Sequence, residues 1–338
     1  MSNKTITPDN QSDPILIVFP KFIGDAINTL PAIELLRQLY PKTPFHFLVR
    51  PHLVALFETQ NLPLVDVIED KRYAKPKWGI FKKSRALKKA NYQLAVLFRG
   101  SLAEAALCRL TGIKSVIGYA QNGRKPLLSY ALKLNENHHY IHRYCRIVNE
   151  AHGSPFDSFN APSLSTRESP FVSPQTPTIG CYFGGKNKDT RYYPTALSAQ
   201  VVALLLDNTP CNVVLLGDQQ EVADNQAIIE QLTNHQTRVL NLAGKTSLPE
   251  LVNVTGQLTA LISIDSGPMH MACATGTPCV ALVGLGTSPW NIVAPKVAKF
   301  EAIVANGFSL DDHRIIESIE PAEVLRTFQS LMSRLSDE

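Results

Sequence analysis

Short apolar runs alternate with more polar, amphipathic stretches along most of the chain. The runs are rich in β-branched side chains and lack regular polar interruptions, which is typical of strands buried on both faces. In the first half they predict strands at residues 15–19, 45–49, 64–68 and 94–98. The segments between and after them predict helices at residues 26–39, 52–59, 82–89 and 101–110. Strands that alternate with helices imply a parallel sheet.

The alternation stops in residues 153–178 and then resumes. That segment contains five prolines and many serines and threonines, a composition typical of a linker. Beyond it, strands are expected at residues 178–183, 212–216, 238–241, 260–264 and 279–283. Helices are expected at residues 195–206, 221–232, 248–255, 269–275 and 320–335. We predict an α/β protein with domains at residues 1–160 and 179–338, a linker at 161–178, and a last helix that is a candidate to pack back on the first domain.

The composition is that of a globular protein, and its main use is to exclude other classes of protein. Of the 338 residues, 44% are hydrophobic and 18% are charged, which is enough apolar surface for sizeable cores. No apolar run approaches the roughly 20 residues that span a bilayer. The polar first 14 residues lack the apolar core of a signal peptide. The six cysteines form no CxxC pair, so we expect reduced thiols in a cytoplasmic protein.

Charge divides the chain into two unlike halves. Residues 1–160 carry 22 Lys and Arg against 12 Asp and Glu, whereas the remaining residues carry 11 against 17. The stretch from Lys71 to Lys89 holds nine Lys and Arg, no acid and three aromatic residues. A solvated basic face, a nucleic-acid contact and an anionic membrane surface all suit such a stretch. No nucleic-acid motif accompanies it, and the opposite signs of the two halves predict different partners.

The turn after the strand at 260–264 is the strongest candidate for a binding site. Asp265 ends the strand, Ser266 and Gly267 form a tight turn, and Pro268 suits the first turn of a helix. Free amides at a helix N-terminus, together with the helix dipole, bind anions. These residues leave an ordinary N-cap with a glycine turn as the alternative.

Three other strand-to-helix turns carry polar groups. The segment 184–194 combines two glycines with three cations, including Lys188 and Arg191, and suits either a diphosphate or solvent. A later turn ends in Glu221, whose carboxylate suits ribose hydroxyls or simply the adjoining helix N-terminus. After the first strand comes Asp25, which is either a general base or an N-cap.

The remaining motifs predict little chemistry. The turn at 284–289 begins like a dinucleotide-binding fingerprint, but Pro289 stands where the third glycine belongs. The cluster His138, His139 and His142 has no carboxylate or cysteine near it with metal-ligand spacing, so we expect no metal site. A serine nucleophile elbow is also missing from the sequence.

Three motifs follow one another in a specific order. Residues 24–32 read GDAINTLPA, residues 241–248 read NLAGKTSL, and residues 265–272 read DSGPMHMA. They resemble the patterns G-D-x-x-x-x-x-P-A, N-L-x-G-x-T-x-L and D-S-G-x-x-H-x-A of glycosyltransferase family nine, the ADP-heptose:lipopolysaccharide heptosyltransferases. Order and spacing agree from about residue 14 to about residue 290, so the three motifs together are far more specific than any one of them.

The resemblance implies a GT-B fold, in which two Rossmann-like parallel-sheet domains face each other across a cleft. It implies inverting, metal-independent transfer of heptose from ADP-heptose to the inner core of a lipopolysaccharide precursor, without a cofactor. Asp25 aligns with the catalytic base of the family. The residues expected at the donor site are Gly24, Lys188, Arg191, Glu221, Thr246, Leu248, Asp265, Ser266, Gly267 and His270.

The first domain would then bind a lipid-linked, phosphorylated acceptor at the cytoplasmic face of the inner membrane. Basic residues of this domain are the candidates for the acceptor side: Lys71, Arg72, Arg99, Arg124 and Lys125. Two departures from the family are notable, since Arg191 replaces the commoner lysine and the loop at 284–289 is one residue longer than usual. The main alternative is transfer of another nucleotide-activated sugar to a surface glycan. A nicotinamide-dependent oxidoreductase and a non-catalytic nucleotide-sugar binder are the others.

Overall fold

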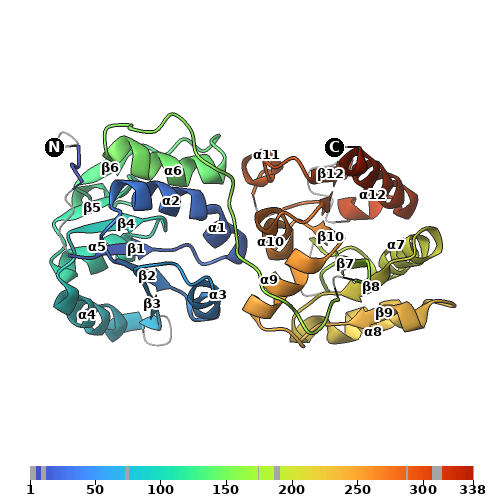
Figure 1. Ribbon diagram of the computed structural model, residues 1–338. Coiled ribbons are helices and arrows are strands. Elements are labelled where there is room, and N and C mark those ends of the chain that lie inside the picture. The colour runs from blue at the N-terminus through green and yellow to red at the C-terminus, as the bar shows by residue number, and fades with distance from the viewer. Residues whose placement is uncertain are drawn as a thin grey trace. The chain divides into compact units, whose positions relative to one another are not determined.

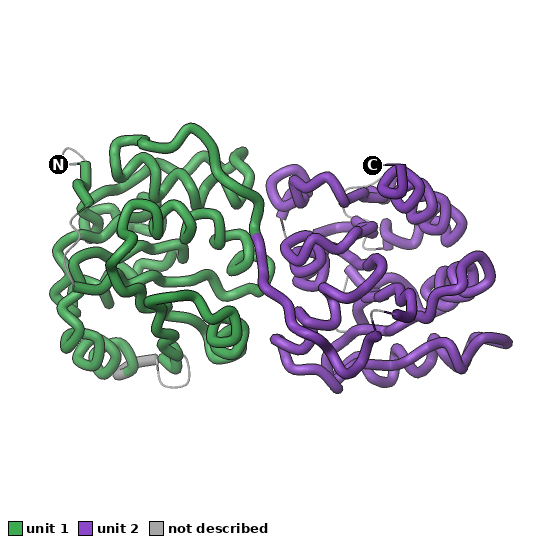
Figure 2. Tube along the Cα trace, in the orientation of Figure 1, with its two compact units in different colours: residues 1–162 green, residues 163–338 purple. Residues whose placement is uncertain are grey.

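The chain divides into two compact units, residues 1–162 (unit 1) and residues 163–338 (unit 2), as Figure 2 shows. The computed structural model describes residues 5–8, 13–72, 76–173, 175–185, 191–286, 288–306 and 314–337, with the backbone alone at 76–78. The boundary between the units falls inside the proline-rich segment. Each unit has its own sheet and its own set of helices (Figure 1).

Unit 1 is built on a six-stranded parallel sheet with the order β3-β2-β1-β4-β5-β6. Its strands are β1 (Ile15–Val18), β2 (Phe45–Val49), β3 (Val65–Glu69), β4 (Leu94–Leu97), β5 (Ser115–Tyr119) and β6 (Tyr130–Leu132). Its α-helices are α1 (Ile23–Asn28), α2 (Leu30–Leu39), α3 (Val54–Thr59), α4 (Pro76–Leu87), α5 (Leu102–Thr111) and α6 (Tyr140–Ala151). In the register of the sheet, Ile15 lies between Phe45 and Leu94, so β1 is fully buried at its centre.

The single helix expected at residues 26–39 is two helices, α1 and α2, which meet at Thr29. The Thr29 hydroxyl donates a hydrogen bond of 2.7 Å to the carbonyl of Ala26 and closes α1. Pro31 follows in the first turn of α2 and has no N–H to donate back to Ile27. The prediction of one continuous helix was therefore wrong, because proline at this place begins a helix rather than continuing one.

Unit 2 is built on a second six-stranded parallel sheet, with the order β12-β11-β10-β7-β8-β9. Its strands are β7 (Thr178–Tyr182), β8 (Asn212–Leu215), β9 (Val239–Asn241), β10 (Ala260–Ile264), β11 (Cys279–Val283) and β12 (Phe300–Val304). Its α-helices are α7 (Thr195–Asn208), α8 (Val222–Glu230), α9 (Leu248–Gln257), α10 (Gly267–Thr275), α11 (Trp290–Val293) and α12 (Pro321–Ser336). The last helix, α12, packs on α7, β11 and β12 of its own unit.

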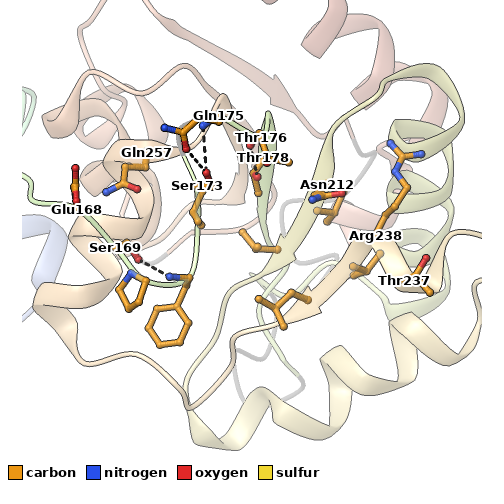
Figure 3. Close-up of a pocket in the computed structure, with 17 residues that line it drawn as sticks. Glu168, Ser169, Ser173, Gln175, Thr176, Thr178, Asn212, Thr237, Arg238 and Gln257 are labelled. Atoms are coloured by element: carbon orange, nitrogen blue, oxygen red, sulfur yellow. Dashed lines mark hydrogen bonds between the residues drawn. The ribbon is translucent and has the colours of Figure 1, made fainter.

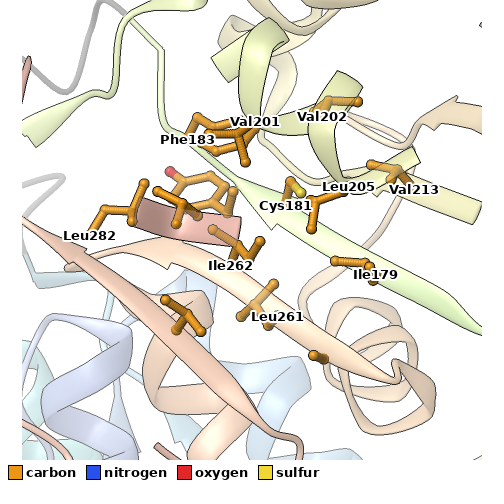
Figure 4. Close-up of a cluster of buried hydrophobic side chains, with 14 of the residues drawn as sticks. Ile179, Cys181, Phe183, Val201, Val202, Leu205, Val213, Leu261, Ile262 and Leu282 are labelled. Atoms are coloured by element: carbon orange, nitrogen blue, oxygen red, sulfur yellow. The ribbon is translucent and has the colours of Figure 1, made fainter. Parts of the chain in front are cut away.

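The core of unit 2 lies between its sheet and the covering helices. Figure 4 shows Ile179 and Cys181 of β7 beside Val201 and Leu205 of α7, with Ile262 of β10 next to them. All five side chains are essentially inaccessible to solvent, as expected where apolar strands are covered by helices.

Counting strands from the start of each unit gives the same order, 3-2-1-4-5-6, in both sheets. This is the order of the Rossmann fold, so the prediction of two Rossmann-like parallel-sheet domains is confirmed. The order reverses between β1 and β4 in unit 1 and between β7 and β10 in unit 2. Ligands of such sheets bind at the carboxyl ends of the strands that flank this reversal. None of the helices in the described part of the chain is long and apolar enough to cross a membrane.

Candidate functional site

The turns at the carboxyl ends of β7 and β10 bring two opposite charges together in unit 2. Asp265 directly follows β10, and Arg191 lies in the segment after β7. Burial raises the pKa of Asp265 above its ordinary value, and the Arg191 charge opposes that rise. The guanidinium therefore lies close enough to the carboxyl group to interact with it across the point where the strand order reverses.

The N-terminus of α10 lies beside this pair. Ser266 occupies the N-cap position with an extended backbone, but its side chain makes no capping hydrogen bond to the helix. Its hydroxyl instead donates to the Ile264 carbonyl at 3.2 Å. Ser266 is therefore the N-cap residue, as the alternative had it, but it lacks the side-chain hydrogen bond of an ordinary cap, so the first amides of α10 have no capping side chain. His270 follows in the same helix, one turn later, and is partly buried.

A glycine-rich loop after β11 forms a pocket against Asp265. The pocket has a volume of about 300 Å³ and is lined by Asp265, Val283, Gly284, Leu285, Gly286, Ser288, Pro289 and Trp290. A side chain at position 286 would place its Cβ 2.9 Å from Oδ2 of Asp265, so any larger residue there would have to displace this carboxylate. The loop that weakly resembled a dinucleotide fingerprint thus forms one wall of the site.

Glu221 joins the turns after β7 and β8. Its side chain is 1% exposed, and its Oε1 accepts hydrogen bonds from the Tyr182 hydroxyl at 3.0 Å and the Gly185 amide at 3.2 Å. Its Oε2 accepts from the Asp218 amide at 2.8 Å, and the Asp218 carboxylate accepts in turn from the Gln220 amide. The carboxylate therefore fixes two neighbouring turns at the predicted donor edge, and its contact with ribose stays a prediction.

The turn after β9 lies against the turn after β8. The Gly244 amide donates to the Gly217 carbonyl at 3.0 Å, and Gly244 has a left-handed φ of 69°. A Cβ at this position would lie 2.5 Å from Oε1 of Gln219, so the close approach requires glycine. Thr246 and Leu248 follow directly and are both partly exposed at the start of α9.

The structure thus places most of the predicted donor residues on one edge of unit 2. They lie on successive turns or helix starts after β7, β8, β9 and β10: Arg191, Glu221, Thr246, Leu248, Asp265, Ser266, Gly267 and His270. Lys188 lies outside the described residues, and Gly24 belongs to unit 1.

The predicted base, Asp25, lies at the carboxyl end of β1, beside the point where the strand order of unit 1 reverses. It is the third residue of α1 and partly buried, next to the buried Gly24. Phe22 is the N-cap of α1, so the alternative that Asp25 caps this helix was wrong. Burial raises the pKa of Tyr144, and the negative charge of Asp25 adds to that rise, which places the two groups near each other.

Two arginines predicted for the acceptor side belong to a buried ionic network. Arg72 donates to Asp70 from Nε at 2.7 Å and also pairs with Glu104. Arg99 donates to Glu104 at 2.6 Å and pairs with Asp70 at 3.4 Å. Burial would raise the pKa of Asp70, but the hydrogen bonds and charge of Arg72 outweigh it and hold this pKa below its ordinary value. The network neutralises both guanidinium groups inside unit 1.

Arg124 is also an interior residue. It is 1% exposed, donates from Nε to the Tyr119 carbonyl at 2.7 Å and binds the Arg99 carbonyl through Nη1. Burial lowers its pKa to about 10. By contrast, Lys71 and Lys125 are exposed, and Lys71 pairs with Glu69 at 2.6 Å.

These positions change the interpretation of the acceptor side. The guanidinium groups of Arg72 and Arg124 hold the protein together in the described conformation, and acceptor contact at these two positions stays a prediction. Sequence reasoning missed the carboxylates Asp70 and Glu104 that pair with the arginines. One signal was available, because Asp70 directly follows β3 and stands two residues before Arg72.

Another pocket, of about 600 Å³, lies at the opposite edge of the unit 2 sheet (Figure 3). Its walls are residues 168–173, 175 and 176, the first residues of β7, β8 and β9, the two residues before β9, and Gln257. The Arg238 side chain at this pocket donates to the carbonyls of Leu206, Thr209 and Cys211. The pocket therefore lies away from the donor turns. Within the described ranges, no group of three or more His, Cys, Asp or Glu side chains is arranged to hold a metal.

Comparisons with known proteins agree with this arrangement. The family model of glycosyltransferase family 9 (heptosyltransferase) matches residues 80–302. Lipooligosaccharide heptosyltransferase 2 of Haemophilus ducreyi is 25% identical over 314 residues, covering 86% of this chain and 88% of that protein.

Solved structures extend the likeness over nearly the whole chain. The Escherichia coli ADP-heptose lipopolysaccharide heptosyltransferase II superposes with a TM-score of 0.82 at 22% identity, covering 96% of this chain and 99% of that one. An E. coli heptosyltransferase with ADP-2-deoxy-2-fluoro heptose gives a TM-score of 0.71 at 18% identity, covering 94% and 99%. These likenesses confirm the GT-B fold and the sequence resemblance. The chain belongs to glycosyltransferase family 9 and is a glycosyltransferase.

Proposed function

We propose that this enzyme transfers heptose from ADP-heptose to the inner core of a lipopolysaccharide precursor, with inversion at the anomeric carbon and without a metal. The observation that carries the proposal is the convergence of the donor residues on the carboxyl edge of the unit 2 sheet. The relatives support this choice of donor and acceptor, because one is a lipooligosaccharide heptosyltransferase and another an ADP-heptose lipopolysaccharide heptosyltransferase.

In the proposed step, a carboxylate oxygen of Asp25 takes the proton from the acceptor hydroxyl. The acceptor oxygen then forms a bond to the anomeric carbon of heptose while the bond from that carbon to the diphosphate breaks. ADP leaves with the electron pair, and the proton remains on Asp25. A base whose position allows this transfer contributes typically about 10²–10⁴-fold to the rate.

The charge that builds on the departing diphosphate needs a stabilising group other than a metal. Arg191 supplies a positive charge, and the amides of Ser266 and Gly267 at the start of α10 supply hydrogen-bond donors. Glu221 is the proposed partner of the ribose hydroxyls. A preorganised set of this kind acts on the transition state because its dipoles are already aligned before the bond breaks.

The exposed face of α4 is the proposed contact with an anionic membrane. Phe81 is 54% exposed, and Lys82 and Arg85 of the same helix are exposed as well. Lys88 and Lys89 are exposed in the 3-10 turn that directly follows α4. In the described part of the chain, none of these four cations pairs with a carboxylate. Exposed cations around an aromatic side chain suit an interface of phosphate headgroups and acyl chains.

Vesicle sedimentation tests the membrane contact. We expect the protein to bind phosphatidylglycerol vesicles and to remain free with phosphatidylcholine vesicles. The triple variant Lys82→Glu, Arg85→Glu and Lys88→Glu should lose this binding. The matched variant with Lys42, Lys114 and Lys133 changed to Glu carries the same charge change on exposed residues elsewhere in unit 1. Equal losses in both variants would contradict a contact through α4.

The transfer itself is tested by ADP release from ADP-heptose in the presence of a heptose-free core acceptor. Asp25→Asn should lower kcat by at least about 100-fold and leave the Kd of ADP within about twofold. Asp66→Asn is the control, because Asp66 is an exposed carboxylate on β3 of the same unit. EDTA should leave the rate unchanged.

Three results would contradict the proposal. Turnover with UDP-, GDP- or CMP-sugars but not with ADP-heptose would identify another donor. A near-normal rate in Asp25→Asn would exclude Asp25 as the base. Loss of the rate in EDTA, restored by a divalent cation, would exclude the metal-free reaction.

A further inference from the structure

An exposed aromatic ring precedes the proposed base on the turn after β1. Phe22 is 58% exposed, and its carbonyl accepts the Ala26 amide at 3.0 Å as the first bond of α1. Isolated exposed apolar side chains are common on protein surfaces and need no function. The case for a function of Phe22 therefore depends on its position and on the rigidity of its backbone. Phe22 stands three residues before Asp25, at the carboxyl edge of the sheet.

The backbone that presents Phe22 is held on two sides by side chains from neighbouring turns. Arg99, after β4, donates from Nε to the Phe19 carbonyl at 3.0 Å. His52, after β2, donates from Nε2 to the Lys21 carbonyl at 2.9 Å. The segment from Phe19 to Phe22 is therefore fixed before any ligand binds, which reduces the entropy cost of binding on it.

A positive charge accompanies the ring. The Lys21 ammonium lies 4.4 Å from the centre of the Phe22 ring, within the range of a cation–π contact. These two adjacent residues together present an apolar ring face and a cation. A sugar acid or a phosphorylated sugar has the complementary pair of features, namely a C–H face of the pyranose ring and a nearby anion.

We propose that Lys21 and Phe22 form a binding subsite for the acceptor sugar. Phe22 stacks on the C–H face of the pyranose ring whose hydroxyl Asp25 deprotonates, and Lys21 binds an anionic substituent of the acceptor. The inference rests on the proposed function and names two residues that recognise the acceptor within unit 1.

Direct binding of a deacylated inner-core oligosaccharide, measured by calorimetry without donor, tests the subsite. Phe22→Ala should raise the Kd of the oligosaccharide about tenfold, as expected for loss of one aromatic contact and its buried area. Phe22→Trp should restore the Kd to within about twofold of wild type. The matched control is Phe159→Ala, because Phe159 is 40% exposed in the same unit. All variants should keep the wild-type Kd for ADP.

Lys21→Gln should weaken binding of the oligosaccharide at low salt and flatten its dependence on ionic strength. An unchanged Kd in Phe22→Ala, or an equal loss in Phe22→Trp, would overturn the stacking role. A wild-type protein that does not bind the oligosaccharide would overturn the subsite altogether. Failure of the proposed function looks different, because the oligosaccharide would bind while ADP-heptose gave no transfer.

Discussion

Replacement of Glu104 by glutamine should destabilise unit 1 strongly. Glu104 is completely buried and binds both Arg72 and Arg99. The substitution leaves Asp70 as the one carboxylate of this network for two guanidinium groups, and it points an amide N–H at one of them. Removal of one partner from a buried ion pair costs about 3–5 kcal/mol. For a domain of this size, about 3 kcal/mol lowers Tm by about 6–12 °C.

Thermal unfolding followed by circular dichroism, at pH 7 and fixed salt, measures this change. Glu150→Gln is the control, since the Glu150–Arg146 pair is partly exposed on α6 and contributes about 0.3–0.5 kcal/mol. In a double-mutant cycle, Arg99→Gln and Glu104→Gln together should cost less than the sum of their separate effects. A Tm for Glu104→Gln as close to wild type as that of the control would refute the reasoning, because the network would then contribute nothing to stability.

Three further changes test the donor edge. Glu221→Gln should lower Tm and weaken ADP binding in calorimetry, because the amide cannot accept from all three donors. Tyr182→Phe removes one of these donors and should lower Tm without changing the Kd of ADP. If both variants raised the Kd of ADP equally, a direct role for Glu221 would be contradicted. Because burial raises the pKa of Asp265, the folded protein holds that proton more tightly than the unfolded chain. The free energy of unfolding in urea should therefore fall as pH rises above about 4, and Asp265→Asn should remove this fall. If wild type and Asp265→Asn showed the same dependence of this free energy on pH, the prediction would be refuted. Gly244→Ala should lower the stability of the protein more than Gly112→Ala. Both glycines have a positive φ, but only a Cβ at position 244 would contact a neighbouring side chain, Gln219. Equal urea midpoints for the two variants would show that Gln219 moves away without cost.

The central strands were predictable because they are buried on both faces. β1 is an unbroken apolar run and β10 contains one polar residue, the buried Ser263, and the expected ranges agree with the structure to within a residue. Three strands were not predicted. The edge strand β12 contains Glu301, since one side of an edge strand meets solvent. The edge strand β6 of unit 1 is three residues long, and its neighbour β5 contains Gly118, which makes room for Arg124.

The candidate site was predictable where it depends on local sequence and not where it depends on folding. A turn such as Asp265-Ser266-Gly267 contains its own strand end, glycine and helix start, so adjacency in the chain identifies it. The pairing of Arg72 with Glu104 joins residues 32 positions apart, which no local pattern records. For this reason the count of basic residues overstated the exposed charge of unit 1, because Arg72 and Arg124 are buried.

The repeated strand order has a consequence for how such an enzyme diversifies. Each unit completes its own sheet and core, and α12 returns to the unit in which it begins. Under the proposed function, donor recognition and acceptor recognition are therefore encoded in two separate units of one chain. Exchange of residues 163–338 for the matching half of a relative would then alter the choice of nucleotide sugar and leave the choice of acceptor unchanged. On this proposal the two units are exchangeable modules, and new sugar linkages become available by recombination as well as by point substitution.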